Sequence, residues 1–273
     1  MEQAASAYEK MVAAKVHSGL YSRWILKWSH KGGVMKGVME VIQERQSVRI
    51  PFDRERPVSK QDLRQILEAM RWAPTAHNMQ NFEVLVINDK RALETIGNIK
   101  SRISIEFLRE NYQQLSFSEE ELLKKKVGLL GTNFPPLWRD PAKLDEVARE
   151  STPSSLKDTI RNSPVLLIVI YDSRKRAPAS AGDVLGFISL GCVMENMWLM
   201  ARSLGISLQI MSVFSADKVE KEVKRVLHIP EYMKIAFASR LGYPISMPAK
   251  YLRVRRDVED FTHYNRFGNK GLD

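Results

Sequence analysis

Two arginines and a serine occupy every second position in one short stretch of the chain: Arg45, Ser47 and Arg49. A guanidinium group offers a planar fork of donors that matches phosphate geometry, and a neighbouring hydroxyl supplies a further donor. Three side chains at this spacing can converge on one oxyanion at the end of a helix, which is predicted to stop before Pro51 because proline disfavours helical conformation in the preceding residue. The alternative is that both arginines complement the helix dipole and extend into solvent. Taken alone, the pattern favours that alternative.

A polar loop at residues 72–82 lies between a predicted amphipathic helix, capped by Ser59, and an apolar run at residues 84–87. Such loops commonly carry ligand-binding side chains because the flanking elements hold them rigid. Asn78 and Gln80 both have amide groups, which can donate and accept hydrogen bonds. His77 is expected to line the loop or the edge of a pocket rather than act as a catalytic base.

The bulk composition predicts a soluble globular protein. The chain has 273 residues, of which 44% are hydrophobic and 27% charged, which suits one generous domain or two small ones. No apolar run approaches the roughly 20 residues needed to span a bilayer, so we expect no integral membrane association. The first thirty residues lack the apolar centre of a signal peptide. The single cysteine, Cys192, favours a cytoplasmic location.

The net charge of +10 raises the possibility of a nucleic-acid partner. The basic residues are dispersed among 32 acidic ones, and their clusters at residues 124–126, 174–176 and 253–256 are short. No zinc spacing or recognition helix accompanies them. We therefore expect no nucleic-acid binding. A basic protein that binds nucleic acid or an anionic surface remains an alternative, and its affinity would fall steeply with salt.

Apolar runs predict four strands, at residues 83–88, 165–171, 206–214 and 235–241. Eight or more helical segments are interspersed with them, which indicates an α+β fold whose sheet is covered by helices. A long helix capped by Asp183 and running to residue 204 is apolar nearly all round, so it must be central or lie at a subunit interface. Glu195 inside it is either a paired structural carboxylate or a dimer contact.

The domain organisation follows from changes in character along the chain. Residues 1–33 form an amphipathic arm, which we expect to dock on the body of the protein or on a second subunit rather than on a membrane. Residues 34–273 form the main domain, beginning with a helix at residues 34–46. A helical insert at about residues 100–161 has no strand signal and is either a lid over a site or a surface elaboration.

Several common sites are not indicated. No Gly-x-Gly-x-x-Gly follows a predicted strand, which argues against a dinucleotide fold of the Rossmann type. No Gly-x-Ser-x-Gly or metal-spaced histidine pattern is present. We therefore predict no catalytic nucleophile and no metal ligands.

The order Arg-x-Ser-x-Arg, helix, Ala-Pro-Thr-x-x-Asn-x-Gln-x-Phe, strand resembles the N-terminal half of the FMN-dependent nitroreductase superfamily. The resemblance covers the chain from about residue 34 to the C-terminus, and is weak at the insert. It implies a nitroreductase-like fold with a mostly antiparallel central sheet and a long central helix at a dimer interface. One departure is Asn81, where the family often has proline.

The resemblance also implies an FMN site. The phosphate would bind Arg45, Ser47 and Arg49, and the ring edge would be oriented by amide groups. A cation near ring N1 and O2 would stabilise the reduced flavin, with Arg255 the best candidate and Arg256 next. The strand end at residues 209–212 would face the flavin mainly through its backbone. The predicted cofactor-binding residues are Arg45, Gln46, Ser47, Arg49, Asn78, Gln80, Gln209, Ile210, Met211, Ser212, Arg255 and Arg256.

The resemblance further implies a homodimeric flavoprotein oxidoreductase with FMN at the subunit interface. NADH or NADPH would reduce the FMN, which would then reduce a small electron-poor acceptor such as a nitroaromatic, a quinone or an activated alkene, in a ping-pong scheme. A specialised flavin enzyme of the same superfamily, of the reductive dehalogenase or flavin-cleaving type, is the alternative. No side-chain nucleophile is required in the main scheme.

Overall fold

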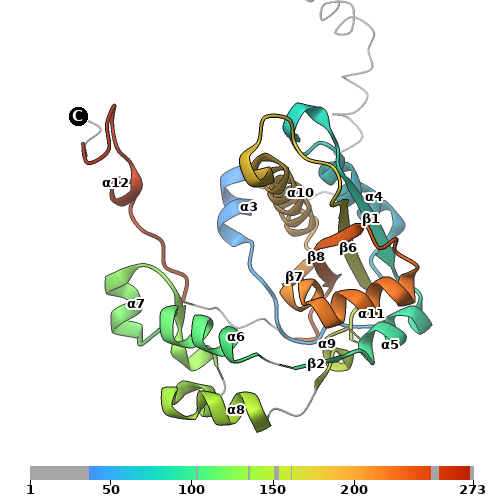
Figure 1. Ribbon diagram of the computed structural model, residues 1–273, viewed down its shortest axis with the longest axis horizontal. Coiled ribbons are helices and arrows are strands. Elements are labelled where there is room, and N and C mark those ends of the chain that lie inside the picture. The colour runs from blue at the N-terminus through green and yellow to red at the C-terminus, as the bar shows by residue number, and fades with distance from the viewer. Residues whose placement is uncertain are drawn as a thin grey trace, which may run out of the picture. The chain divides into compact units, whose positions relative to one another are not determined.

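The computed structural model describes residues 37–102, 104–134, 136–150, 154–160, 162–246 and 252–270 (Figure 1). The chain divides into two compact units, residues 1–41 and 42–273. The amphipathic arm predicted for residues 1–33 lies outside the described residues. All the predicted site residues belong to the second unit.

A four-stranded sheet forms the core of the second unit, in the order β1–β6–β8–β7, and each neighbouring pair is antiparallel. The predicted α+β class with a mostly antiparallel sheet is therefore confirmed. The strand expected at residues 206–214 is too long, because Ser212–Ser215 forms the 3₁₀ helix η7 and turns Phe214 into the core. The strands are β1 (Phe82–Ile87), β6 (Val165–Asp172), β7 (Ser207–Met211) and β8 (Met233–Gly242).

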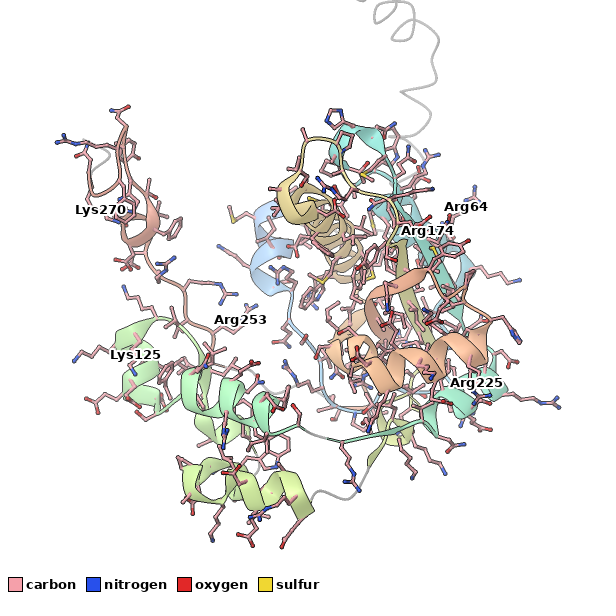
Figure 2. All side chains as sticks on the ribbon, in the orientation of Figure 1. Arg64, Lys125, Arg174, Arg225, Arg253 and Lys270 are labelled. Atoms are coloured by element: carbon pink, nitrogen blue, oxygen red, sulfur yellow. The ribbon has the colours of Figure 1, made fainter. Side chains whose placement is uncertain are left out.

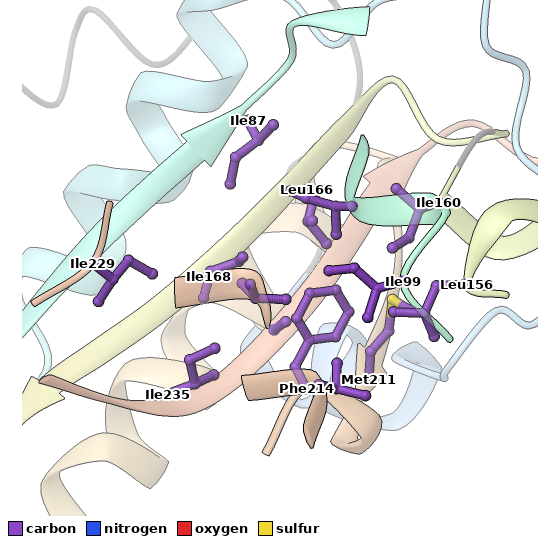
Figure 3. Packing of buried hydrophobic residues seen from close by; sticks show 14 of the residues in the cluster. Ile87, Ile99, Leu156, Ile160, Leu166, Ile168, Met211, Phe214, Ile229 and Ile235 are labelled. Atoms are coloured by element: carbon purple, nitrogen blue, oxygen red, sulfur yellow. The ribbon is translucent and has the colours of Figure 1, made fainter. Parts of the chain in front are cut away.

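Both faces of the sheet are covered by helices, as the uninterrupted apolar run of β6 requires. Because side chains alternate along a strand, Leu166 and Ile168 enter one core cluster while Leu167 and Val169 enter the other. Figure 3 shows the first cluster, in which Phe214 packs among isoleucines and leucines from the sheet and its neighbours. Helices α5 (Lys90–Gly97), α9 (Lys157–Ile160) and α11 (Asp217–Leu227) cover this first face, and α4 (Lys60–Arg71) and α10 (Val184–Ser203) cover the second.

The start of α4 is as predicted. The Ser59 hydroxyl accepts a hydrogen bond from the backbone N–H of Asp62 at 3.0 Å, which satisfies one of the unpaired donors of the first turn. Asp183 occupies the N-cap position of α10, as predicted, but its side chain does not cap the helix. Its carboxylate accepts from the N–H of Ala177 at 2.8 Å instead.

Helix α10 lies between the sheet and solvent. Its inner face buries Leu190, Val193 and Met197 in the second core cluster, which confirms that this long helix packs against the core. A subunit interface on its outer face stays a prediction. Of the described residues, Ala181–Ser203 is the one segment long and apolar enough to cross a membrane, and core helices of soluble proteins pass the same test. Its outer face exposes Val184, Phe187 and Ile188.

The insert is not purely helical, so the expectation of no strands there is wrong. Lys100–Ser101 (β2) pairs with Ser154–Ser155 (β5), and Ser116–Phe117 (β3) pairs with Leu129–Leu130 (β4). These ladders are only two residues long, too short to leave a periodic signal. The β2–β5 ladder brings the two ends of the insert together. Its helices are α6 (Ile105–Arg109), η2 (Glu110–Gln114), α7 (Glu119–Lys125), η3 (Gly131–Asn133), η4 (Pro136–Arg139), η5 (Pro141–Lys143) and α8 (Leu144–Glu150).

Four shorter helices complete the described chain. The first precedes the Arg-x-Ser-x-Arg segment, the second lies within the polar loop, the third directly precedes α10 and the fourth lies in the C-terminal tail. They are α3 (Val38–Glu44), η1 (Ala76–Asn78), η6 (Ala181–Asp183) and α12 (Val258–Phe261).

Candidate functional site

The Arg-x-Ser-x-Arg segment is not a helix end, so that prediction is wrong. Helix α3 ends at Glu44, and the segment that follows runs beside the edge strand β7. Ser47 forms a parallel bridge with Leu208, and the N–H of Val48 donates to the carbonyl of Leu208 at 2.9 Å. β-Branched residues such as Val48 and Ile50 favour extended backbone. The segment therefore pairs with the edge of the sheet at one point, Leu208.

Extended backbone explains how the predicted anion-binding side chains are presented. Successive side chains of a strand point to opposite faces. Val48 is only 4% exposed, whereas Ser47 is half-buried and Arg49 is exposed. Ser47 and Arg49 thus lie on the face away from the core, and neither side chain has a hydrogen-bond partner among the described residues.

Arg45 lies against α10. Its Nε donates to Glu195 Oε1 at 2.8 Å, and its guanidinium lies 4.9 Å from the centre of the Trp198 ring. Glu195 is therefore a paired carboxylate in this chain, one of the two roles considered for it. The ion pair neutralises part of the charge of Arg45 and leaves its two terminal nitrogens without a hydrogen-bond partner in the described chain.

Arg240, a buried arginine that is not among the predicted cofactor-binding residues, binds the backbone of this segment from the core side. Arg240 on β8 is only 1% exposed, and its Nη2 donates to the carbonyls of Val48 at 3.2 Å and Ile50 at 2.7 Å. Burial lowers the pKa of Arg240 to about 10, which leaves it protonated at neutral pH. The sequence does contain a sign of this role, because an arginine inside an otherwise apolar predicted strand must find hydrogen-bond partners in the folded protein.

Arg240 also binds Gln209, one of the predicted cofactor-binding residues on β7. Its Nε donates to Gln209 Oε1 at 2.7 Å, and the two residues face each other across the β7–β8 pair. The other predicted residues of this strand end have different surroundings. Ile210 packs against the second core cluster, Met211 is buried in the first, and Ser212 begins η7. Gln46 is half-buried without a described side-chain hydrogen bond.

The polar loop is held in a strained conformation. His77, Asn78 and Gln80 have φ values of 50°, 53° and 41°, the left-handed region that non-glycine residues rarely adopt. Nε2 of Gln80 donates to Oδ1 of Asn78 at 3.1 Å, so the two predicted amides pair with each other. Strain of this kind is often found at binding sites. The N–H of Ala76 donates to the Ser189 hydroxyl at 3.0 Å, which ties the loop to α10.

Asn81 differs from the other loop amides because it is buried. It is 7% exposed, and both polar atoms of its side chain lack a hydrogen-bond partner among the described residues. It lines a cavity of about 370 Å³ together with Asp172, Arg174 and Tyr232. The side chain of Arg174 lowers the pKa of Asp172 to about 2 through hydrogen bonds. This cavity also includes Gln80 but none of Arg45, Ser47 and Arg49.

The C-terminal tail reaches the same segment through Arg253 (Figure 2). Its Nη1 donates to the carbonyl of Arg45 at 2.7 Å, and its Nη2 donates to the carbonyl of Gln43. Among the described residues, the Arg255 side chain donates to the carbonyl of its neighbour Val254 and to no other group, and Arg256 lies near Phe261. The choice of Arg255 and Arg256 stays a prediction, and Arg253 is the tail arginine that contacts the segment in the described chain.

The two halves of the predicted site attach to α10 at different points. The loop meets the helix at Ser189, and Arg45 meets it at Glu195 and Trp198. At a rise of 1.5 Å per residue, Ser189 and Trp198 are about 13–14 Å apart along the helix axis. No described hydrogen bond or ion pair joins Asn78 or Gln80 to Arg45, Ser47 or Arg49.

Comparison with known proteins identifies the family of the chain. The sequence matches the model described as Nitroreductase family over residues 42–243. The chain belongs to the nitroreductase family. Membership supports the broad class of flavin oxidoreductase and specifies neither electron donor nor acceptor. The match spans the Arg-x-Ser-x-Arg segment, the polar loop, the insert and all four strands of the sheet.

Solved structures have the same nitroreductase fold at low sequence identity. A Bacteroides fragilis nitroreductase with bound FMN is 22% identical, with a TM-score of 0.52, and the match covers 82% of this chain and 97% of that one. An FMN-dependent nitroreductase from Clostridium difficile is 16% identical, with a TM-score of 0.51 and coverage of 84% and 99%. Iodotyrosine deiodinase bound to FMN and 3-iodo-L-tyrosine is 20% identical, with a TM-score of 0.54 and coverage of 85% and 100%.

The tie between the loop and α10 is testable by hydrogen exchange. In Ser189→Ala the N–H of Ala76 loses its acceptor, and a neutral hydrogen bond contributes about 0.5–1.5 kcal/mol. We expect the amide of Ala76 to exchange up to about tenfold faster. Ser203→Ala on the same helix is the control, because its hydroxyl bonds only within its own turn. Equal exchange at Ala76 in both variants and the parent would show that the loop is held by other contacts.

Proposed function

We propose that this chain is an FMN-dependent oxidoreductase that uses NADH or NADPH to reduce a small electron-poor acceptor by ping-pong hydride transfer. The observation that carries the proposal is the placement of Ser47 and Arg49 on the outward face of a segment paired with β7. The Bacteroides fragilis and Clostridium difficile structures, which bind or depend on FMN, support the choice of cofactor.

The donor set fits a phosphate group. Ser47 offers a hydroxyl and Arg49 a guanidinium, and neither is used in the described chain. Charge-assisted bonds of this kind are stronger than neutral ones. Arg45 contributes less charge because Glu195 pairs with it at 2.8 Å. We therefore assign the main phosphate contact to Arg49 and Ser47, with Arg45 assisting through its terminal nitrogens.

The remaining residues suit the orientation of a planar ring. Gln209 Oε1 is fixed by Arg240, which leaves its Nε2 as a donor beside the phosphate-binding segment. Asn78 and Gln80 offer further amide groups from the strained loop. A bound flavin supplies the two-electron chemistry itself, and the chain's own side chains bind and orient it. The proposal needs no catalytic side chain.

We further propose that the active form is a homodimer. The outer face of α10 exposes Val184, Phe187 and Ile188, and a Cβ at Gly191 on the same helix would meet nothing within 4 Å. An exposed apolar stripe of this kind marks an interaction surface. A two-fold axis across the helix would bring the loop end of one α10 toward the Arg45 end of the other. Each flavin site would then take residues from both subunits.

The identity of the electron acceptor is the most specific part of the proposal. Nitroaromatics, quinones and activated alkenes are the acceptors that we expect, because a reduced flavin transfers hydride to electron-poor centres. A reductive dehalogenase or flavin-cleaving enzyme is the alternative, and the similarity of iodotyrosine deiodinase, which binds 3-iodo-L-tyrosine, makes an iodinated phenol worth including among the acceptors tested. We propose a cytoplasmic location, in keeping with the single cysteine Cys192.

The visible spectrum of the purified protein tests the cofactor and the donor together. We expect a yellow protein that releases FMN on denaturation and loses its visible absorption when NADH or NADPH is added without oxygen. Addition of a nitroaromatic, a quinone or 3-iodo-L-tyrosine should restore the absorption if that compound is an acceptor. Colourless protein that also fails to take up added FMN would refute the proposal.

Substitution of Arg49 tests the assignment of the phosphate contact. Arg49→Ala removes a hydrogen bond to a charged group, worth about 1.5–3 kcal/mol, so the Kd for FMN should rise roughly 10- to 150-fold. Arg45→Ala should cost less because Glu195 already engages that side chain. The control is Arg64→Ala, an exposed arginine on α4 (Figure 2). An Arg49→Ala variant that binds FMN as tightly as the Arg64→Ala control would show that the contact is assigned wrongly.

The dimer can be tested on the exposed stripe of α10. Ile188 is 56% exposed, so Ile188→Asp places a charge where the second copy would pack and should give a monomer with weakened FMN binding. Leu137→Asp is the matched control, since Leu137 is 64% exposed and lies in the insert. Sedimentation velocity and flavin content report the result. A parent protein that sediments as a monomer and still holds FMN would exclude the shared site.

A further inference from the structure

Arg240 is a buried cation without a buried counter-charge. It is 1% exposed, and no carboxylate of the described residues pairs with it. Removing a charge from water is costly unless hydrogen bonds satisfy it. A cation buried at such a cost can make several hydrogen bonds that an apolar side chain in a strand cannot make.

The partners of Arg240 come from three separate parts of the chain. Two are the carbonyls of Val48 and Ile50 in the phosphate-binding segment, and one is Gln209 Oε1 on β7. Its Nη1 completes the set with the carbonyl of Thr159 and the hydroxyl of Ser163, both at 3.4 Å. The ring of Phe52 lies 4.2 Å from the guanidinium carbon. A planar fork with five N–H donors suits this arrangement, and a lysine ammonium with three donors does not.

The two carbonyls that Arg240 binds lie on either side of Arg49. The Val48 carbonyl belongs to the peptide group before Arg49, and the Ile50 carbonyl belongs to the peptide group after Ile50. Holding the backbone on both sides of Arg49, the outward-facing residue between them, restricts the direction of its side chain. The same guanidinium holds the side-chain oxygen of Gln209. One buried side chain therefore sets the relative positions of two predicted flavin contacts that belong to different elements.

We propose that Arg240 is a positioning residue for the phosphate end of the flavin site, and this inference rests on the proposed function. Arg240 acts through the backbone at Val48 and Ile50 and does not touch the ligand. Preorganised donors bind an anion more tightly because less ordering is needed on binding. The loss of Arg240 should therefore weaken the recognition of the phosphate more than the recognition of the ring.

A comparison of FMN with riboflavin, which lacks the phosphate, separates this role from general stability. The variants are Arg240→Met, which removes the charge and the donors, and Arg240→Lys, which keeps the charge. Arg225→Met on the surface of α11 is the control, because Arg225 pairs only with Glu222 on its own helix (Figure 2). Flavin-free full-length protein is titrated with each flavin, and thermal unfolding is followed alongside.

The preference of the protein for FMN over riboflavin is the expected readout. The preference should fall about tenfold in Arg240→Met, as for the loss of one contact to a charged group, and by a smaller factor in Arg240→Lys. The affinity for riboflavin should change less than about threefold in both variants. Equal weakening of both flavins, or failure of both variants to fold, would overturn the inference and assign Arg240 to stability alone. A parent protein that binds neither flavin would instead refute the proposed function on which the inference rests.

Discussion

The bridge between Ser47 and Leu208 on the edge strand β7, in which the Val48 N–H donates to the Leu208 carbonyl, is the contact on which the candidate site depends. It converts a short polar sequence into extended backbone whose side chains alternate between core and solvent. Val48 anchors the inner face, and Ser47 and Arg49 occupy the outer one. Arg240 fixes the register from below through the carbonyls of Val48 and Ile50. The proposed anion site would therefore depend on the position of this backbone as much as on the cations themselves.

Helix α10 is the second constraint because it serves several elements at once. The helix lies against the sheet (Figure 1), and its inner face completes the core there. Ser189 holds the strained loop, and Glu195 holds Arg45. The ion pair with Glu195 limits the positive charge that Arg45 can offer to a ligand. Its outer apolar face suits the packing of a second copy of the chain. In the proposed dimeric flavoprotein, this one helix of twenty residues would serve folding, ligand binding and assembly together.

The sequence was sufficient for the elements that bury long apolar runs. The unbroken run of β6 predicted a strand covered on both faces, and Ser59 predicted the start of α4. It was insufficient where a long-range partner decides the local structure. The end of α3 is set by pairing with β7, and the ladders of the insert are two residues long. Arg240 was missed because its five acceptors come from segments separated along the chain.

A crystal structure of the protein grown with FMN is the most direct test of the central claim. The account predicts that the phosphate lies within hydrogen-bonding distance of the Ser47 hydroxyl and the Arg49 guanidinium, with Ser47 and Val48 still bound to Leu208 of β7. A phosphate bound elsewhere, or an Arg49 side chain that extends into solvent while FMN occupies the protein, would contradict it.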